Sequence, residues 1–287
     1  MNKNDYKIPE KTKIHLKDYP TTYDGPLTKK EVKEKLLPAN LKTMAAYQDA
    51  LYAENTRGIV VVLQAMDAAG KDGLIKHVFT ALNPQGVTVT SFKVPNGEEL
   101  DHDYLWRIAK ALPRRGDIAI FNRSHYEDVL VTRVHDLLKS QPLPQDLLDD
   151  DIWNRRFKEI RGFENYLSDN GFRVVKFFLH LSKDEQKKRL MDRIVNPDKH
   201  WKFSSADVNE RAYWNDYQKA YEDLIAHTST KRAPWYVIPA DRKWYARYAV
   251  SEIFVDLLKD MHPTYPELAE EERKHLTRWK EILEKDD

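Results

Sequence analysis

Short apolar runs alternate along this chain with longer segments in which apolar residues recur every three or four positions. The runs are rich in β-branched and aromatic residues, which predicts buried strands at residues 58–64, 87–92, 117–121, 173–181 and 235–239. The periodic segments around them predict helices at residues 29–54, 73–82, 98–112, 129–138, 151–169, 182–196, 205–228 and 243–260. Strands that alternate with helices indicate an α/β fold, with a parallel five-stranded sheet that carries helices on both faces.

The two ends of the chain differ in character from the segment between them. Residues 1–28 are polar and contain several prolines, which predicts an extended arm lying on the domain or on a partner subunit. Pro38 interrupts the first helical pattern, and we expect a kink or break there because proline has no N–H to donate. The remaining chain predicts one domain over residues 29–262 and a polar C-terminal helix within residues 263–287.

The composition of the chain says more about its binding partners than about its fold. The 287 residues include 47 Lys and Arg against 46 Asp and Glu, so the overall net charge of +1 predicts no polyanion partner, nucleic acid included, and any anion site must be local. The absence of cysteine excludes disulfides, thiolate metal sites and cysteine nucleophiles. No apolar stretch approaches the roughly 18 residues of a membrane span, and the N-terminus lacks an apolar signal region. We therefore expect a cytoplasmic protein with no membrane partner.

The first strand runs into a glycine-containing loop and then into a helix, an order typical of phosphate-binding P-loops. In the pattern G-x-x-x-x-G-K-[ST], Gly70 and Lys71 occupy their expected places. Ala65 replaces the first glycine, and Asp72 replaces the metal-binding hydroxyl. Because the backbone and the lysine of such a loop face the anion, we expect phosphate contacts from Ala69, Gly70, Lys71, Asp72 and Gly73. The alternative is a tight strand-to-helix turn whose charges are exposed to solvent.

Two carboxylates lie in or beside this loop, where they would repel a phosphate unless a cation lay between them. Asp67 is inside the loop, and Asp72 follows the lysine. Because Mg2+ favours carboxylate, phosphate and water oxygens, the pair indicates a metal ion held partly by the loop itself.

The third strand ends in a second polar cluster, which parallel strands would place at the same edge of the sheet. Asn122 stands where a Walker B motif would have a metal-binding aspartate, and it is followed by Arg123, Glu127 and Asp128. A guanidinium binds two phosphate oxygens at once, so Arg123 is expected to act beside Lys71. The alternatives are a structural ion pair of Arg123 with Glu127 or Asp128, and an Asp128 that only faces a helix N-terminus.

A basic, partly aromatic segment after the fourth strand predicts a mobile lid at residues 187–212. Lids of nucleotide kinases exclude water and bring arginines onto the transferred phosphoryl group, which makes Arg193 and Lys202 candidates for nucleotide or phosphate contact. A basic run is also typical of a solvated helix face. Arg133, on the helix after the third strand, fits a continued basic track and a plain surface position equally well.

Three of these segments together resemble the polyphosphate kinase 2 family. They are the loop at residues 64–73, the end of the third strand at 121–130 and the lid at 193–203. The similarity extends from about residue 30 to residue 260 and implies a thymidylate-kinase-like P-loop fold. It also implies reversible phosphoryl transfer between inorganic polyphosphate and AMP or ADP, with Mg2+ as the cofactor, which Mn2+ can replace.

The resemblance also assigns roles to matching positions of this chain. It implies that the catalytic residues are Asp67, Lys71, Arg123, Glu127 and Asp128. It implies metal binding by Asp67 and Asp128, and polyphosphate binding by the loop residues together with Arg123, Arg133 and Arg193. It implies nucleotide binding by Asn122, Glu127, Arg193 and Lys202.

The acceptor and the assembly are finer expectations. Asn122 and Glu127 depart from the Asp-Arg-Ser form of members that use only diphosphates, and resemble the group that phosphorylates both AMP and ADP. The expected partners are polyphosphate and adenine nucleotides, with guanine nucleotides left open, and a homo-oligomer, either dimer or tetramer. Two other functions stay open: an ATP-dependent nucleotide or small-molecule kinase of the same fold, and a polyphosphate-binding or nucleotide-binding module without catalysis.

Overall fold

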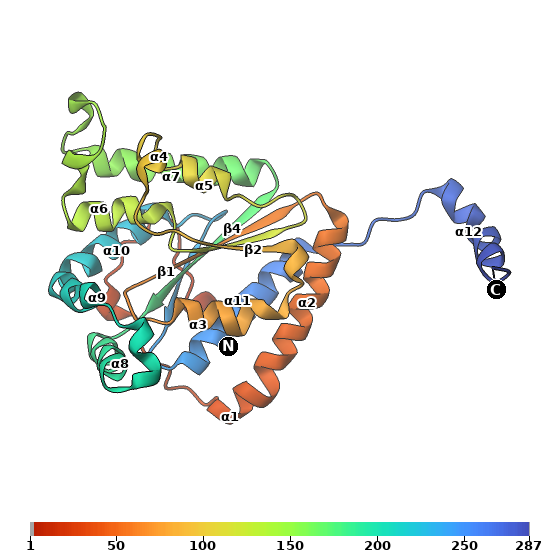
Figure 1. Ribbon diagram of the computed structural model, residues 1–287, viewed down its shortest axis with the longest axis horizontal. Coiled ribbons are helices and arrows are strands. Elements are labelled where there is room, and N and C mark those ends of the chain that lie inside the picture. Colours follow the sequence, from red (N-terminus) through yellow and green to blue (C-terminus); the bar gives the residue numbers. More distant parts are fainter. Residues whose placement is uncertain (1–2, 287) are drawn as a thin grey trace.

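A single sheet of five parallel strands, in the order β2-β3-β1-β4-β5, forms the centre of the computed structural model, which describes residues 3–286 (Figure 1). The strands are β1 (Gly58–Ala65), β2 (Val87–Ser91), β3 (Ile118–Asn122), β4 (Phe172–His180) and β5 (Trp235–Pro239). Each strand expected from the apolar runs is confirmed to within one residue at either end. The α/β fold class expected from the sequence is therefore confirmed.

The α-helices lie between and beyond the strands, and short 3-10 turns extend several of them. The first half of the chain contains α1 (Lys29–Glu31), α2 (Leu37–Glu54), α3 (Lys71–Val78), α4 (Gly97–Leu100), α5 (Trp106–Lys110) and α6 (Val131–Val134). The second half contains α7 (Ile152–Asp169), α8 (Lys183–Val195), α9 (Ser205–Asn209), α10 (Trp214–Thr228), α11 (Lys243–Met261) and α12 (Glu270–Leu283).

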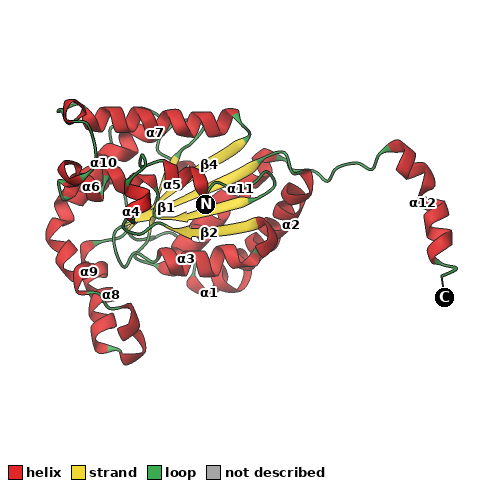
Figure 2. Cartoon of the chain, turned by 45° about the horizontal axis from the view of Figure 1, so that its top comes forward, coloured by secondary structure: helices red, strands yellow, loops and turns green. Residues whose placement is uncertain are grey.

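Helices cover both faces of the sheet, and the alternation along β1 divides its side chains between them (Figure 2). Ile59, Val61 and Leu63 belong to a hydrophobic cluster that includes residues of α2, α3 and α11. Val60 and Val62 belong to the opposite cluster, which includes residues of α5, α7 and α10. All 8 residues of β1 are buried, as expected of a central parallel strand between two helical layers.

The strand order places a crevice at the carboxyl edge of the sheet. From β1 the chain crosses to β2, returns to β3 beside β1, and then continues on the other side with β4 and β5. In open parallel sheets, ligands bind at the carboxyl ends of the strands where the order reverses in this way. The loop after β1 and the segment after β3 both emerge there.

Two expected helices are wrong in their extent. Residues 98–112 form α4 and α5 with a turn between them, because the Asp103 carboxylate accepts a hydrogen bond from the backbone N–H of Leu105. Such a bond offers the chain a turn in place of a continued helix. Residues 129–138 are helical only over α6 and short 3-10 turns, since Asp136 has a φ of 50° and leaves the helical region.

Pro38 does not break the first helical segment. The chain passes from α1 into a π-helical turn over Val32–Leu36, and Pro38 then lies in the first turn of α2. Because proline cannot donate the helical hydrogen bond, the wider turn before it accommodates the missing donor. The expected kink is a local widening within one helical run.

The N-terminal segment packs on the domain of its own chain. Lys7 forms an antiparallel bridge with Tyr236 of β5, which covers this edge of the sheet. Ile8, Ile14 and Leu16 are buried. The first two residues of the expected arm, and residue 287 of the expected C-terminal segment, lie outside the described residues.

The C-terminal helix α12 stands apart from the rest of the molecule, joined to α11 by an extended segment (Figure 1). None of the residues of α12 is buried. Within residues 3–286, no helix combines the length and the apolar character needed to cross a membrane.

Candidate active site

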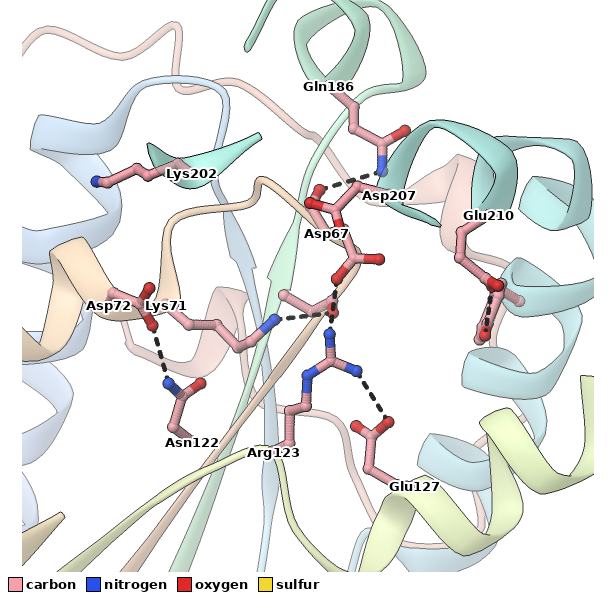
Figure 3. A network of polar contacts seen from close by, with 12 residues as sticks. Asp67, Lys71, Asp72, Asn122, Arg123, Glu127, Gln186, Lys202, Asp207 and Glu210 are labelled. Atoms are coloured by element: carbon pink, nitrogen blue, oxygen red, sulfur yellow. Dashed lines mark hydrogen bonds and ion pairs between the residues drawn. The ribbon is translucent and has the colours of Figure 1, made fainter. Parts of the chain in front are cut away.

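The loop between β1 and α3 turns sharply through two residues with positive φ, 62° at Ala68 and 107° at Gly70. Glycine adopts this conformation at no steric cost, whereas alanine is strained in it. Lys71 opens α3, and its ammonium reaches back to donate to the carbonyl oxygen of Ala65 at 3.3 Å (Figure 3). Burial lowers the pKa of Lys71, and the positive charge of Arg123 lowers it further. A partly buried cation of this kind attracts a phosphate more strongly than a fully solvated one.

Arg123 joins this loop to the segment after β3. Its guanidinium donates to Asp67 at 2.7 Å and to Glu127 at 3.2 Å (Figure 3). Burial opposes the charged form, but the carboxylates of Glu127 and Asp67 outweigh burial and raise the pKa of Arg123. The structure therefore brings Asp67, Lys71, Arg123 and Glu127 together. It also contains the Arg123–Glu127 ion pair that was the structural alternative.

Asn122 ties three elements together at the same edge. Its amide donates to the carboxylate of Asp72 at 2.8 Å and to the hydroxyl of Ser91 at 3.3 Å. Asp72 lies in the first turn of α3, where the helix dipole favours a negative charge. The expected Asn122 and Asp72 thus contact each other, from β3 and α3.

Asp128 and Arg133 are engaged with other partners. The Asp128 carboxylate is 8% exposed, pairs with Arg156 at 3.1 Å and accepts a hydrogen bond from Gln141 at 3.1 Å. Burial raises the pKa of Asp128, and the charge of Arg156 counters this effect. Arg133 forms an ion pair with Asp223 at 2.7 Å and does not line the cavity of the site. Of these two residues, only Asp128 lines that cavity.

Arg193 and Lys202 lie at the lid, which we define as residues 196–213 after α8. Arg193 lies in the last turn of α8, where it pairs with Asp207 at 2.6 Å and donates to the backbone carbonyl of Lys202 at 3.2 Å. Burial raises the pKa of Asp207, and the nearby charge of Asp67 raises it further. The lid therefore faces the loop across the site (Figure 3). Both of these contacts of Arg193, with Asp207 and Lys202, use its Nη1 atom.

A cavity of about 1620 Å³ lies between the loop, the end of β3 and the lid. Ligand pockets are commonly about 300–1,000 Å³, so this one has room for a nucleotide together with part of a phosphate chain. Its polar lining comes from elements far apart in the sequence, and includes Asp67, Asp72, Asn122, Arg123, Glu127, Lys202 and Asp207.

Two residues that contact the loop were not predicted from the sequence. Gln186 and Arg189 of α8 donate hydrogen bonds to backbone carbonyl oxygens of the loop. Both residues lie in a helix whose many charged residues are typical of a solvent-exposed surface, yet both are buried. Their spacing of three residues, which places them on one helix face, is the only indication in the sequence.

A buried ionic network lies behind the segment after β3. Lys176 of β4 is fully buried and donates to Glu164 of α7 at 2.6 Å and to the Tyr126 hydroxyl at 3.0 Å. Burial lowers the pKa of Lys176, and the Glu164 charge opposes this. A lysine within an apolar strand run was the available signal, since a buried lysine requires a partner.

Asp67, in the loop itself, is a carboxylate that could share a divalent cation with a phosphate bound in the cavity. It lines the cavity, and one of its oxygens accepts from Arg123. Within residues 3–286, no group of three or more His, Asp or Glu side chains is arranged to hold a metal ion. This arrangement fits a cation such as Mg2+, which takes most of its oxygen ligands from phosphates and water. Asp128, the other expected ligand, shares its oxygens with Arg156 and Gln141.

Comparison with known proteins assigns the family. The model of the family described as polyphosphate kinase 2 (PPK2) matches residues 27–266, most of the chain. The chain belongs to the polyphosphate kinase 2 family. The family assignment made from the three motifs is thereby confirmed.

Solved and curated relatives of this polyphosphate kinase 2 chain are similar over most of its length. A crystal structure of polyphosphate kinase 2 from Arthrobacter aurescens TC1 aligns with a TM-score of 0.80 at 39% identity, covering 93% of this chain and 98% of that one. An ADP-polyphosphate phosphotransferase from Rhodopseudomonas palustris is 45% identical over 280 residues, 97% of each chain. An AMP/ADP-polyphosphate phosphotransferase from Meiothermus ruber is 51% identical over 220 residues, covering 77% of this chain and 79% of that one. The names of the two phosphotransferases differ in the acceptor.

Proposed function

We propose that this chain transfers phosphoryl groups between inorganic polyphosphate and adenine nucleotides, and that it accepts both AMP and ADP. The observation that carries the proposal is that Lys71 lies beside Arg123 and Asp67, and that the latter two line one cavity of about 1620 Å³. Transfer between phosphates requires positioning and charge neutralisation more than covalent chemistry, and this is what these side chains supply. The names of the relatives support the same reaction.

In the proposed reaction, a terminal phosphate oxygen of the nucleotide attacks the terminal phosphorus of polyphosphate, and the bridging P–O bond of the donor breaks. Lys71 and Arg123 neutralise the charge on the moving group. Asp67 and Glu127 hold the guanidinium of Arg123 in place. A nucleotide phosphate is itself an adequate nucleophile, so no side chain is assigned as general base. Bound Mg2+, held by Asp67 with phosphate oxygens and water, would add further charge neutralisation.

The remaining assignments follow the same geometry. Phosphate contact is assigned to the P-loop backbone, Arg123 and Arg193, and nucleotide contact to Asn122, Glu127, Arg193 and Lys202. The positions of Asn122 and Glu127 in the cavity lining, and the name of the Meiothermus ruber relative, support the dual acceptor. Arg133 has the weakest support as a polyphosphate contact, because Asp223 already neutralises it.

A donor–acceptor assay tests the proposal. Purified protein is incubated with Mg2+ and long-chain polyphosphate, with AMP or ADP supplied separately, and the products are resolved by chromatography. Formation of ATP from both acceptors is the expected result. Formation of ATP from ADP alone would remove the dual-acceptor assignment. If neither acceptor reacts, and ATP instead serves as donor to another acceptor, the chain is an ATP-dependent kinase of the same fold.

We also propose that the chain assembles as a homo-oligomer, either dimer or tetramer. Leu276, Trp279 and Ile282 of α12 are 52%, 49% and 44% exposed at helical spacing, which supports a contact outside the single chain. Light scattering on the full chain should give a multiple of 33.8 kDa. A mass of one chain at micromolar concentration would contradict the proposal.

A further inference from the structure

Arg189 of α8 is 6% exposed, and its guanidinium uses every N–H that it has. Nη1 donates to the carbonyl oxygens of Ala68 and Ala69 at 3.1 and 2.8 Å. Nη2 donates to the carbonyl oxygens of Ala240 and Asp241 at 2.8 and 2.9 Å. Nε donates to a glutamate one turn earlier on α8, at 2.8 Å. One side chain thus links α8, the P-loop and the segment after β5.

Gln186, one turn before Arg189 on the same helix, continues the contact. Its amide nitrogen donates to the carbonyl oxygen of Asp67 at 3.1 Å, and its amide oxygen accepts from Arg211 at 2.7 Å. Three consecutive carbonyl groups of the P-loop, those of Asp67, Ala68 and Ala69, therefore bond to α8.

These bonds orient the opposite side of each peptide group. In a trans peptide the N–H points away from the C=O, so the N–H groups of Ala68 and Gly70 point away from α8. Ala68 is held at a φ of 62°, which costs an L-residue about 1–2 kcal/mol unless other contacts favour it. Arg189 supplies such contacts to the carbonyl of this strained residue and to the next one, and Gln186 bonds the carbonyl before it.

We infer that Arg189 and Gln186 are positioning residues, which fix the P-loop backbone so that its N–H groups are directed at a phosphate. They bond only the carbonyl side of the loop, so they act through its backbone and not by touching the phosphate. The inference rests on the proposed function for the phosphate chemistry of the ligand, but it can be tested by binding alone.

The test measures the dissociation constant for tripolyphosphate with Mg2+ by calorimetry, together with kcat and KM for polyphosphate-dependent ADP phosphorylation. Arg189→Gln should weaken tripolyphosphate binding at least about tenfold, because the buried loop carbonyls lose charged donors. Arg189→Lys should recover little, since an ammonium cannot span two pairs of carbonyls. Gln186→Met removes a single donor and should weaken binding about threefold to tenfold.

Lys188→Gln is the matched control, because Lys188 is exposed, lies next to Arg189 and loses the same charge. Its binding and turnover should stay within about twofold of the unmodified protein, as surface substitutions usually do. Equal losses of tripolyphosphate affinity in Lys188→Gln and Arg189→Gln would show that the effect comes from net charge alone. That result would overturn the inference. If folded Arg189→Gln or Gln186→Met has a lower melting temperature but unchanged tripolyphosphate affinity, the contacts of α8 with the loop only stabilise the fold. That result would overturn the inference. If the unmodified protein binds tripolyphosphate but does not phosphorylate ADP, the proposed function is wrong. The inference about Arg189 and Gln186 is then still decided by the tripolyphosphate affinities of the variants.

Discussion

At the scale of single residues, the site brings two cations and two carboxylates together at the carboxyl edge of the sheet. Lys71 and Asp67 come from the P-loop, while Arg123 and Glu127 come from the segment after β3. Asp67 and Glu127 each accept a hydrogen bond from the guanidinium of Arg123. Among the described residues, the Lys71 ammonium bonds only the Ala65 carbonyl oxygen and no carboxylate. A phosphate entering the cavity would complete the neutralisation of Lys71.

Asp67→Asn tests the importance of the loop carboxylate. The substitution keeps the size of the side chain but removes the charge that pairs with Arg123 and that would bind the metal ion. We expect kcat for polyphosphate-dependent ADP phosphorylation to fall about 100-fold or more. His135→Ala, which removes a cavity-lining imidazole, should lose less than about tenfold because no general base is required. Equal losses in the two variants, with matching circular dichroism spectra, would refute the assignment.

The sequence predicts this group of residues because its members follow strand ends directly. Parallel strands carry Lys71 and Arg123 to the same edge, so local motifs were sufficient. The sequence did not predict Gln186 or Arg189, whose bonds to the loop arise only when α8 packs against it. Nor did it predict that Asp128 faces Arg156 of α7, since no local pattern joins those two positions.

At the scale of elements, long-range contacts fix how the helices sit around the sheet. The strands were predictable because each is a short run rich in β-branched or aromatic residues between polar turns. The helix expected at residues 98–112 was not, because the side chain of Asp103 competes with the helical backbone bond. Element boundaries of this kind depend on single side-chain hydrogen bonds that apolar periodicity does not register.

Glu54, at the end of α2, provides a test at this scale. It accepts two hydrogen bonds from Arg57, each 2.7 Å long, and Arg57 also donates to the carbonyl oxygen of Met261 at the end of α11. The hydrogen bonds from Arg57 lower the pKa of Glu54 from 4.5 to about 2, against the opposing effect of burial. We expect Glu54→Gln to reduce the free energy of unfolding by about 2–3 kcal/mol at pH 7.

The pH dependence of that difference follows from the direction of the shift. A carboxyl whose pKa is lower in the folded state stabilises the fold above its ordinary pKa and loses this effect as the pH falls. The gap between the unmodified protein and Glu54→Gln should therefore be constant above pH 5 and narrow between about pH 4.5 and 2, as measured by urea titration. A gap that widened in that range would contradict the ion-pair account.

At the scale of the whole molecule, the chain is nearly neutral, and its proposed phosphate chemistry lies at one cavity. The net charge is +1, so attraction of a polyanion must come from local cations such as Lys71 of the P-loop and the cavity-lining Arg123 and Lys202. The family match ends at residue 266, before α12, and α12 contributes no lining residue to the cavity. We therefore expect that the C-terminal helix takes no part in substrate binding within one chain.

Salt should weaken polyphosphate binding steeply, because the binding rests on screened charge contacts. Raising the ionic strength from about 50 mM to about 500 mM should reduce the affinity at least about tenfold. Isothermal calorimetry with long-chain polyphosphate measures this directly. A constant affinity across the range would exclude charge contacts as the main source of binding.

Removal of α12 should leave the chemistry intact. A chain that ends at Pro266 keeps Thr264 and Tyr265, which bond Glu54 and Asp49 of α2. We expect its kcat to stay within about twofold of the full chain, since the removed helix has no buried residue. A large loss of kcat in a folded, truncated protein would place α12 in the active site.

The most direct test of the account is the rate of ADP phosphorylation by polyphosphate in Lys71→Met. Methionine keeps the length and apolar stem of the lysine but removes the cation at the centre of the P-loop. We expect a loss in kcat of about 1,000-fold with an unchanged circular dichroism spectrum and melting temperature. A folded Lys71→Met protein that retained more than about a tenth of the activity would show that transfer does not take place at this loop.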